Sequence, residues 1–351
     1  MAELPQFERL DQAISALLAR RGGRDSLPPG EEGELTPLVD LAAELRSLPR
    51  PEFRARLKSQ LEEKIAMGKA IETEAGETPA LPNELEEKTG MAATTVNPIR
   101  EGFRTITPYL IVRPAEELLA FVKQAFGAQE LFRGTGGAGG IHAEVRIGDS
   151  MVMMGGGPQV PFKTMPTALW MYVPDVDAVY GSAVRAGATP FSEPVDQPYG
   201  DREATVTDVG GNRWYISTHK GAHYRPPRMN DVNLYLHPSG ALRLVDFMER
   251  AFGAETLEKH VDPQGALVHG KVRIGNSVIG MGEAHGPAQN MPSAIYMYVP
   301  DVDRAYERAI AAGGKSLHPP IDQPYGDRNC GVEDEWGNQW YISTHMRDVA
   351  M

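Results

Sequence analysis

The chain repeats itself at a fixed interval of 126 residues. Four strings recur at this interval, which chance does not produce, so residues from about 105 to 345 contain two copies of one unit. A period of this length exceeds the ~20–50 residues of a solenoid repeat. The sequence therefore predicts two tandem domains, at 105–220 and 229–346. The repeated strings are AFGA (125–128 and 251–254), MYVPDVD (171–177 and 297–303), DQPYGDR (196–202 and 322–328) and WYISTH (214–219 and 340–345).

Composition restricts the classes of partner. The chain of 351 residues has a hydrophobic fraction of 41% and a formal net charge of −12. Nucleic-acid backbones and anionic membrane surfaces attract clustered Lys and Arg, so this acidic balance argues against both. The sequence has no run of ~18 apolar residues and begins without a basic or apolar signal region, so we expect a cytoplasmic protein. The single cysteine, Cys330, excludes an internal disulfide and a cysteine-based zinc site.

The first part of the chain differs from the repeats. Apolar residues recur there at helical spacing in three stretches, which predicts a helical N-terminal segment at 1–71. Thr36 followed by Pro37 is typical of a helix start. The acidic, Pro- and Thr-rich stretch at 72–104 is predicted to be a linker. The helices either pack as a small bundle on the main body, mediate association, or bind a regulatory protein partner.

Both repeats have the same predicted order of elements. In the first, TITPYLIV predicts a strand, AEELLAFVKQAFGA a helix that ends at Gly127, and GIHAEVRIG and SMVMMG a hairpin. The order starts again with the strand ALWMYVP, a helix capped by Asp175, the short extended stretch TPFSEP, and the strands EATVTD and RWYISTH. Each domain therefore contains two βαβββ modules, and the fold class is α+β.

These motifs resemble the vicinal oxygen chelate superfamily, which contains glyoxalase I, bleomycin-resistance proteins and extradiol dioxygenases, and within it the PhnB-like branch. The resemblance covers roughly residues 105–345. It implies that paired modules curl into a half-open barrel, that the ligand lies in its concavity, and that the tandem resembles a fused homodimer. The first copy carries it in TPYLIV, IHAEVRIGDSMVMMG, YVPDVDAVYGSAVRAGA and YGDREATVTDVGGNRWYISTH, and the second in HGKVRIGNSVIGMG and YGDRNCGVEDEWGNQWYISTH.

The resemblance also implies where metal-using members take their ligands. A divalent ion needs three or four carboxylates or imidazoles, and none of the corresponding positions here is His, Asp or Glu. We therefore expect no glyoxalase-type metal centre and no cofactor, although a divalent metal held elsewhere stays possible. The positions are Thr107, Val152 or Met153, Ala168 and Tyr215 in the first copy, and Asn233, Ile279 or Gly280, Ala294 and Tyr341 in the second.

Aromatic residues are the candidates for ligand binding. Side chains alternate between the two faces of a strand. Those that alternate in step with Ala168 or Tyr215 are predicted to face the cavity, and Trp214 and Ile216 are predicted to face the helices. Aromatic walls with polar tips suit a flat or amphipathic small molecule. The alternative is that they only pack a narrow barrel, or that the histidines only bind a neighbouring residue. The predicted ligand-binding residues are Tyr109, His142, Trp170, Tyr172, Tyr215, Tyr235, His269, Tyr296, Tyr298 and Tyr341.

Two repeated motifs leave alternatives open. His219 and His345 end the last strand of each copy, as capping residues or at the cavity rim. Arg202 and Arg328 in DQPYGDR either meet an anionic ligand or form a structural pair with an aspartate.

Three functions fit these patterns. The first is a small-molecule-binding protein similar to bleomycin-resistance proteins, without the usual metal centre. The second is a metal-dependent lyase, dioxygenase or thiol transferase of the same superfamily, whose catalytic residues the sequence does not identify. The third is a ligand-sensing protein that acts through its N-terminal helices. Ligand identity and oligomeric state are not predicted.

Overall fold

The computed structural model describes residues 96–136, 139–157, 163–286 and 288–349. The predicted helical segment at 1–71 and most of the predicted linker lie outside the described residues. Residues 96–104, which we call the lead segment, run without helix or strand into the first strand.

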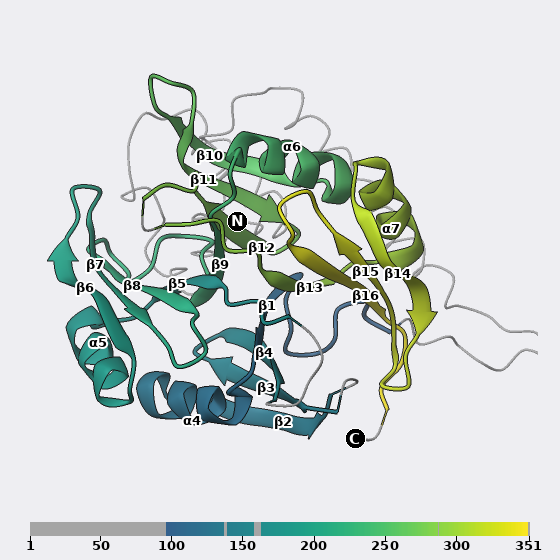
Figure 1. The fold of residues 1–351 in the computed structure, drawn as a ribbon, viewed down its shortest axis with the longest axis horizontal. Coiled ribbons are helices and arrows are strands. Elements are labelled where there is room, and N and C mark those ends of the chain that lie inside the picture. Colours follow the sequence, from purple (N-terminus) through teal and green to yellow (C-terminus); the bar gives the residue numbers. More distant parts are fainter. Residues whose placement is uncertain (1–95, 137–138, 158–162, 287, 350–351) are drawn as a thin grey trace, which may run out of the picture. The chain divides into compact units, whose positions relative to one another are not determined.

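The first repeat contains two modules of the predicted type. The first module is β1 (Ile106–Val112), α4 (Ala115–Phe126), β2 (Gln129–Thr135), β3 (Ile141–Ile147) and β4 (Ser150–Gly156). The second is β5 (Ala168–Tyr172), α5 (Val176–Arg185), β6 (Thr189–Asp196), β7 (Asp201–Thr207) and β8 (Arg213–His219). Figure 1 shows these elements from blue to teal.

The second repeat has the same two modules. Its first is β9 (Val232–Leu236), α6 (Ala241–Phe252), β10 (Glu255–Val261), β11 (Leu267–Ile274) and β12 (Ser277–Met281). Its second is β13 (Ala294–Tyr298), α7 (Val302–Ala311), β14 (Lys315–Asp322), β15 (Asp327–Glu333) and β16 (Gln339–His345). The predicted α+β class and the paired modules are confirmed.

Local signals explain where the helices begin and end. The Asp175 side chain accepts a hydrogen bond of 3.0 Å from the Ala178 N–H, as expected for an N-cap. Gly127 ends α4 with φ of 66°, a left-handed conformation that glycine adopts without steric cost. Both predicted caps are confirmed.

The edge strands β2, β10 and β14 were not among the predicted strands. Their side chains are exposed or only half-buried, so they lack the apolar pattern that marks the inner strands. Hydrogen bonding to β3, β11 and β15 places them in the sheets.

The modules join across the repeats. The two eight-stranded sheets have the orders β14-β15-β16-β13-β1-β4-β3-β2 and β10-β11-β12-β9-β5-β8-β7-β6. In the first, β1 pairs antiparallel with β13, and in the second β5 pairs antiparallel with β9. Each sheet therefore contains one module of each repeat, instead of the two modules of one predicted domain. All described residues form one compact unit.

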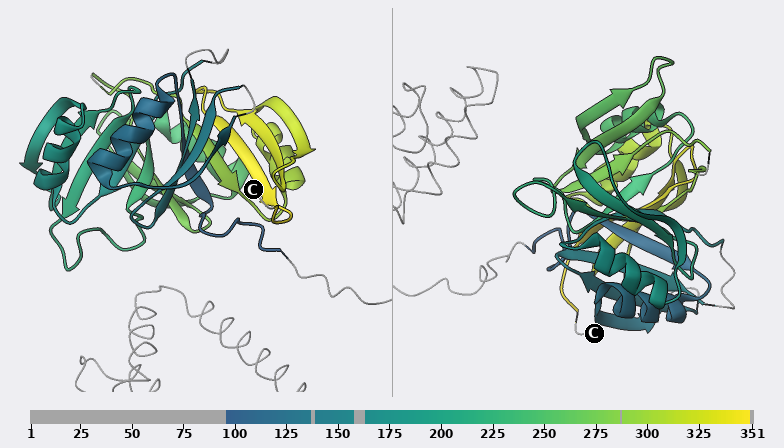
Figure 2. Two further views of the ribbon diagram at one scale, coloured as in Figure 1. Left: turned by 90° about the horizontal axis from the view of Figure 1, so that it is seen from below. Right: turned by 90° about the vertical axis from the view of Figure 1, so that its left-hand side faces the viewer.

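The two modules of one repeat meet through their helices. Helix α4 packs against α5, and α6 against α7, as Figures 1 and 2 show. The Phe126 ring of α4 lies 4.6 Å from the ring of Trp214 on β8, and Phe252 of α6 lies at the same distance from Trp340 on β16. The two modules of each repeat are thus joined through their helices. Each module completes its sheet with a module of the other repeat.

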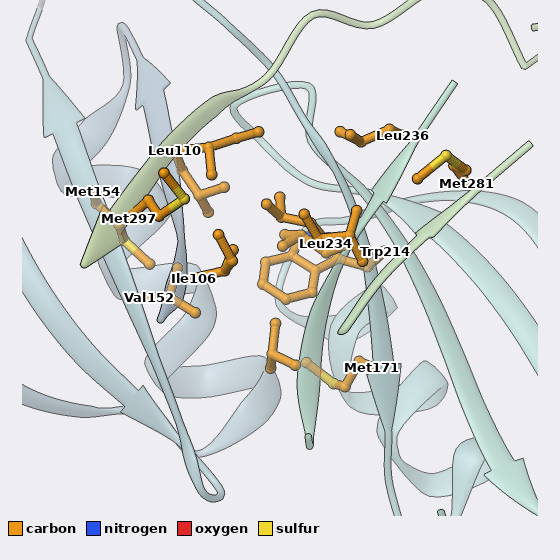
Figure 3. Packing of buried hydrophobic residues seen from close by; sticks show 14 of the residues in the cluster. Ile106, Leu110, Val152, Met154, Met171, Trp214, Leu234, Leu236, Met281 and Met297 are labelled. Carbon is orange, nitrogen blue, oxygen red and sulfur yellow. The ribbon is translucent and has the colours of Figure 1, made fainter. Parts of the chain in front are cut away.

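One hydrophobic core extends behind both sheets. Leu110 and Val152 from one sheet, and Leu234 and Trp214 from the other, belong to the same cluster of buried side chains (Figure 3). Smaller aromatic clusters lie apart from this core, on the opposite face of each sheet. Within the described residues, no helix is both long and apolar enough to cross a membrane.

Candidate ligand-binding faces

The predicted site residues all lie on the sheet faces that point away from the helices. We call the face of the sheet containing β1 face A, and that of the sheet containing β5 face B. Strand alternation places Trp214 and Ile216 in the helix-side core and Tyr215 on face B, as predicted. Face A contains Tyr109, His142, Tyr296, Tyr298 and Tyr341, and face B contains Trp170, Tyr172, Tyr215, Tyr235 and His269.

The aromatic residues of face A interact across the boundary between the repeats. The Tyr109 hydroxyl lies 3.3 Å from Nδ1 of His142, and the Tyr109 ring lies 5.9 Å from that of Tyr341. Tyr296 and Tyr298 pack edge to face at 5.3 Å. Because Tyr109 and His142 belong to the first repeat and the other three to the second, neither repeat holds this cluster alone.

Face B is built in the same way with the repeats exchanged. The Trp170 ring of the first repeat lies 5.8 Å from Tyr235 and 5.6 Å from His269 of the second. The Tyr235 hydroxyl lies 3.2 Å from Nδ1 of His269, and the Tyr215 hydroxyl lies 2.8 Å from Nε2 of His237. His237 was not among the predicted site residues.

Buried aspartates organise the tyrosines of both faces and were also missed. On face A, the Asp327 carboxylate accepts hydrogen bonds from Tyr296 at 2.8 Å and Tyr298 at 3.0 Å. On face B, the Tyr172 hydroxyl donates to Asp201 at 3.4 Å. Both aspartates occupy one position of the repeated DQPYGDR string, so the repeat pointed to them.

The terminal histidines bind these aspartates. His345 Nδ1 lies 2.8 Å from Asp327, and His219 Nδ1 lies 2.6 Å from Asp201. The antiparallel register places each aspartate opposite the histidine of its hairpin. An antiparallel hairpin formed by the DQPYGDR and WYISTH strings, predicted in register, would have placed each aspartate opposite its histidine.

The repeated arginines form structural ion pairs. Arg202 donates to Asp177 at 2.7 and 2.8 Å and to Asp196 at 3.1 Å on the molecular surface. Arg328 contacts Asp303 and Asp322 in the same way. Of the two alternatives for these arginines, the structure shows the aspartate pairs.

Burial sets the protonation of the face residues. Desolvation raises the pKa of Tyr109 and of Tyr235 above the usual value, so both phenols stay protonated near neutral pH and can donate hydrogen bonds. Burial, together with the positive charge of Arg213, lowers the pKa of His237 to about 4. The His237 ring is therefore neutral at pH 7.

Buried polar atoms without a hydrogen-bond partner occur on both faces of the described structure. They include Oγ1 of Thr107 on face A and Nδ1 of His237 on face B. An unpaired buried polar atom costs about 1–3 kcal/mol, so such groups in a native structure call for an explanation.

Comparison with known proteins places this geometry in a family. Residues 103–216 and 241–342 match the glyoxalase/bleomycin resistance protein/dioxygenase superfamily. The chain belongs to this superfamily. The two matched ranges fall on the two repeats, so each repeat corresponds to one glyoxalase-like unit.

Individual relatives agree with this assignment. An uncharacterised protein of Mycobacterium bovis is 32% identical over 122 residues, which cover 32% of this chain and 80% of the relative. An uncharacterised protein of Mycobacterium tuberculosis is also 32% identical over 122 residues, covering 32% of this chain and 72% of the relative. The crystal structure of glyoxalase I from Zea mays is similar with a TM-score of 0.53 and 17% identity, over 68% of this chain and 92% of that chain. This likeness concerns the fold.

The positions that hold metal ligands in metal-using members of the glyoxalase superfamily do not fit a metal here. Thr107, Met153, Ala294 and Tyr341 fall on face A, and Asn233, Gly280, Ala168 and Tyr215 on face B. Val152 and Ile279 point into the helix-side core. In the part of the chain that the structure describes, no three His, Cys, Asp or Glu residues lie together so that they could hold a metal ion.

A groove opens along face A beside the lead segment. Its volume is about 610 Å³, and it runs between the lead segment and strands β2 to β4. The Glu144 carboxylate on its wall is paired with Arg100 of the lead segment. The groove is lined by Arg100, Glu101, Gly102, Phe103, Leu131, Phe132, Arg133, Glu144, Arg146 and Met151.

Proposed function

We propose that this protein binds a small, partly aromatic molecule on its two aromatic faces, as a glyoxalase/bleomycin-resistance-like protein that does not use the usual metal centre. One observation carries the proposal: the ten candidate residues gather into one cluster on each face, with hydroxyl and imidazole groups among the rings. Membership of the PhnB-like branch belongs to the same proposal and rests on the repeated motifs.

The chemistry of the faces supports a flat ligand. The aromatic rings are already ordered by their packing, and their edge-to-face arrangement suits stacking of a further ring. Protonated Tyr109 and Tyr235 can donate hydrogen bonds to a polar group of the ligand. Thr107 Oγ1 and His237 Nδ1 lack partners, and a ligand that bonded to them would recover their desolvation cost.

Equilibrium dialysis of the full-length protein against a panel of small aromatic compounds tests the proposal. We expect compounds to be retained at about one or two molecules per chain. Replacing Tyr109 by Ala on face A, or Tyr235 by Ala on face B, should weaken the affected site at least about tenfold, the equivalent of ~1.4 kcal/mol.

Tyr306 of helix α7 provides a matched control, because it packs on the helix-side core and its hydroxyl donates to Ser316 at 2.8 Å. Tyr306→Ala should leave binding unchanged. Failure of the panel to bind, or binding that neither face variant weakens, would overturn the proposal. Metal retained by the untagged protein at about one or two ions per chain after incubation with Zn, Mn, Fe(II) or Ni would favour the enzyme alternative instead.

A further inference from the structure

The two faces carry opposite charges at one equivalent position. Glu144 on β3 pairs in register with Phe132 and Met153, and Lys271 on β11 pairs in register with Glu258 and Gly280. The repeated VRIG string follows both residues at the same spacing, which makes them equivalent. Face A therefore presents a carboxylate where face B presents an ammonium group.

Glu144 is buried but stays ionised. Its side chain is 5% exposed. Burial alone would raise the pKa of this carboxyl group, but hydrogen bonds from His142 and Arg100 and the positive charge of Arg100 hold it below the usual value. A carboxylate kept charged at this depth requires a cation beside it.

The cation comes from the lead segment and not from the sheet. The Arg100 guanidinium binds Glu144 and lies 4.1 Å from the centre of the Phe103 ring. Phe103 in turn packs edge to face on Tyr298 at 5.8 Å. A flat cation is thus held between a carboxylate and an aromatic face, a combination that favours guanidinium and amidinium groups.

The other arginines of the groove have partners of their own. Arg146 donates to Gln129 at 2.6 Å, and Arg133 binds Glu130 at 2.7 Å. Arg100 and His142, whose Nε2 lies 3.5 Å from the Glu144 carboxylate, are therefore the basic groups in contact with Glu144.

Face B lacks this contact although the chain follows the same path. The backbone N–H of His345 donates to Pro98 at 3.0 Å, and that of His219 donates to Tyr224 at 2.8 Å, so the two approach segments are equivalent. The 126-residue interval places Pro226 at the position of Arg100. Lys271 instead pairs with Glu258 of its own hairpin at 3.1 Å.

We propose that the groove of face A binds an organic cation with a flat guanidinium or amidinium group at Glu144, and that Arg100 occupies this position until such a ligand displaces it. The proposal rests on the proposed function and names the ligand class for one face. Because Arg100 is tethered to the site, it competes at a high effective concentration. The unmodified protein therefore binds such cations weakly, and removal of Arg100 exposes the site.

Isothermal titration with benzamidine tests this, with neutral benzamide as the matched probe. We expect Arg100→Ala to bind benzamidine at least about tenfold more tightly than the unmodified protein does, and more tightly than it binds benzamide. The double variant Arg100→Ala with Glu144→Gln should lose this gain. Arg250→Ala, which removes an arginine of α6 that pairs with Asp246 outside the groove, should behave like the unmodified protein.

Arg100→Gln is the second variant, in case the alanine variant does not fold, and thermal unfolding of each variant establishes that it is folded. Folded Arg100 variants that bind benzamidine no more tightly than the unmodified protein would overturn the proposal. Equal binding of benzamide and benzamidine would overturn selection by charge but leave aromatic binding in place. Failure of both probes, together with failure of the wider aromatic panel, would overturn the proposed function as well.

Discussion

The rings of Tyr109 and Tyr341 lie 5.9 Å apart on face A, although one belongs to the first repeat and the other to the second. They meet because β1 and β16 both flank β13 in one sheet. Each candidate site therefore depends on both repeats, and four predictions test how this arrangement and its buried groups hold together.

A single repeat produced alone, as residues 96–226, should self-associate. It would expose the edges of β1 and β5 that normally pair with β13 and β9, and unpaired inner strands are templates for further pairing. We expect a dimer that rebuilds both sheets, measured by light scattering after gel filtration. A folded monomer with dispersed amide resonances would contradict the cross-repeat pairing.

Trp214→Ala should destabilise the protein by about 3–5 kcal/mol, the range for truncation of a large buried aromatic residue. Trp214 is fully buried, packs on Phe126 and donates a hydrogen bond of 2.8 Å to Asp208. Urea denaturation measures the change. Val195→Ala, at a residue that is 51% exposed, is the control and should lower the free energy of unfolding little. An equal loss of stability in both variants would show that the Trp214 contacts contribute nothing specific.

Asp327→Asn should cost more than Asp201→Asn. The amide places an N–H₂ group among the hydroxyls of Tyr296 and Tyr298 and Nδ1 of His345, and an unsatisfied buried group costs about 1–3 kcal/mol. His345 is 4% exposed, whereas His219 beside Asp201 is 30% exposed and can exchange its partner for water. Chemical denaturation of the two variants decides the order, and a larger loss for Asp201→Asn would reject this account.

Stability should fall between pH 7.5 and 5 partly through His237. Its pKa is about 4 in the folded protein, below the ordinary value of 6.5, so the unfolded chain binds a proton first as the pH falls. The stabilisation that neutral His237 contributes is complete above pH 6.5 and is lost progressively toward pH 4. The free energy of unfolding falls by about 2 kcal/mol by pH 5 through this group.

His237→Gln keeps a hydrogen-bonding group that does not titrate. The free energy of unfolding of this variant should change less over the same interval, as measured by urea denaturation at each pH. If the variant and the unmodified protein lost stability equally between pH 7.5 and 5, titration of His237 would not be the cause.

Much of the site could be predicted from short-range patterns. Strand alternation in WYISTH is a property of the backbone, so it assigned Trp214 to the core and Tyr215 to the face before any packing was known. The cap at Asp175 is equally local. His237 was missed because it follows the end of its strand, and Arg100 because it lies in a stretch without periodicity.

The sequence by itself determined the repeat, the βαβββ modules and the side chains that share a strand face, because each depends on neighbouring residues. Only the tertiary structure decided which modules share a sheet. Strands β1 and β5 of the first repeat are the equivalents of β9 and β13 of the second. No local signal therefore distinguishes pairing within a repeat from pairing across repeats. That choice brings Tyr109 to Tyr341 and Trp170 to Tyr235, while the contact of Arg100 with Glu144 depends on where the lead segment crosses face A.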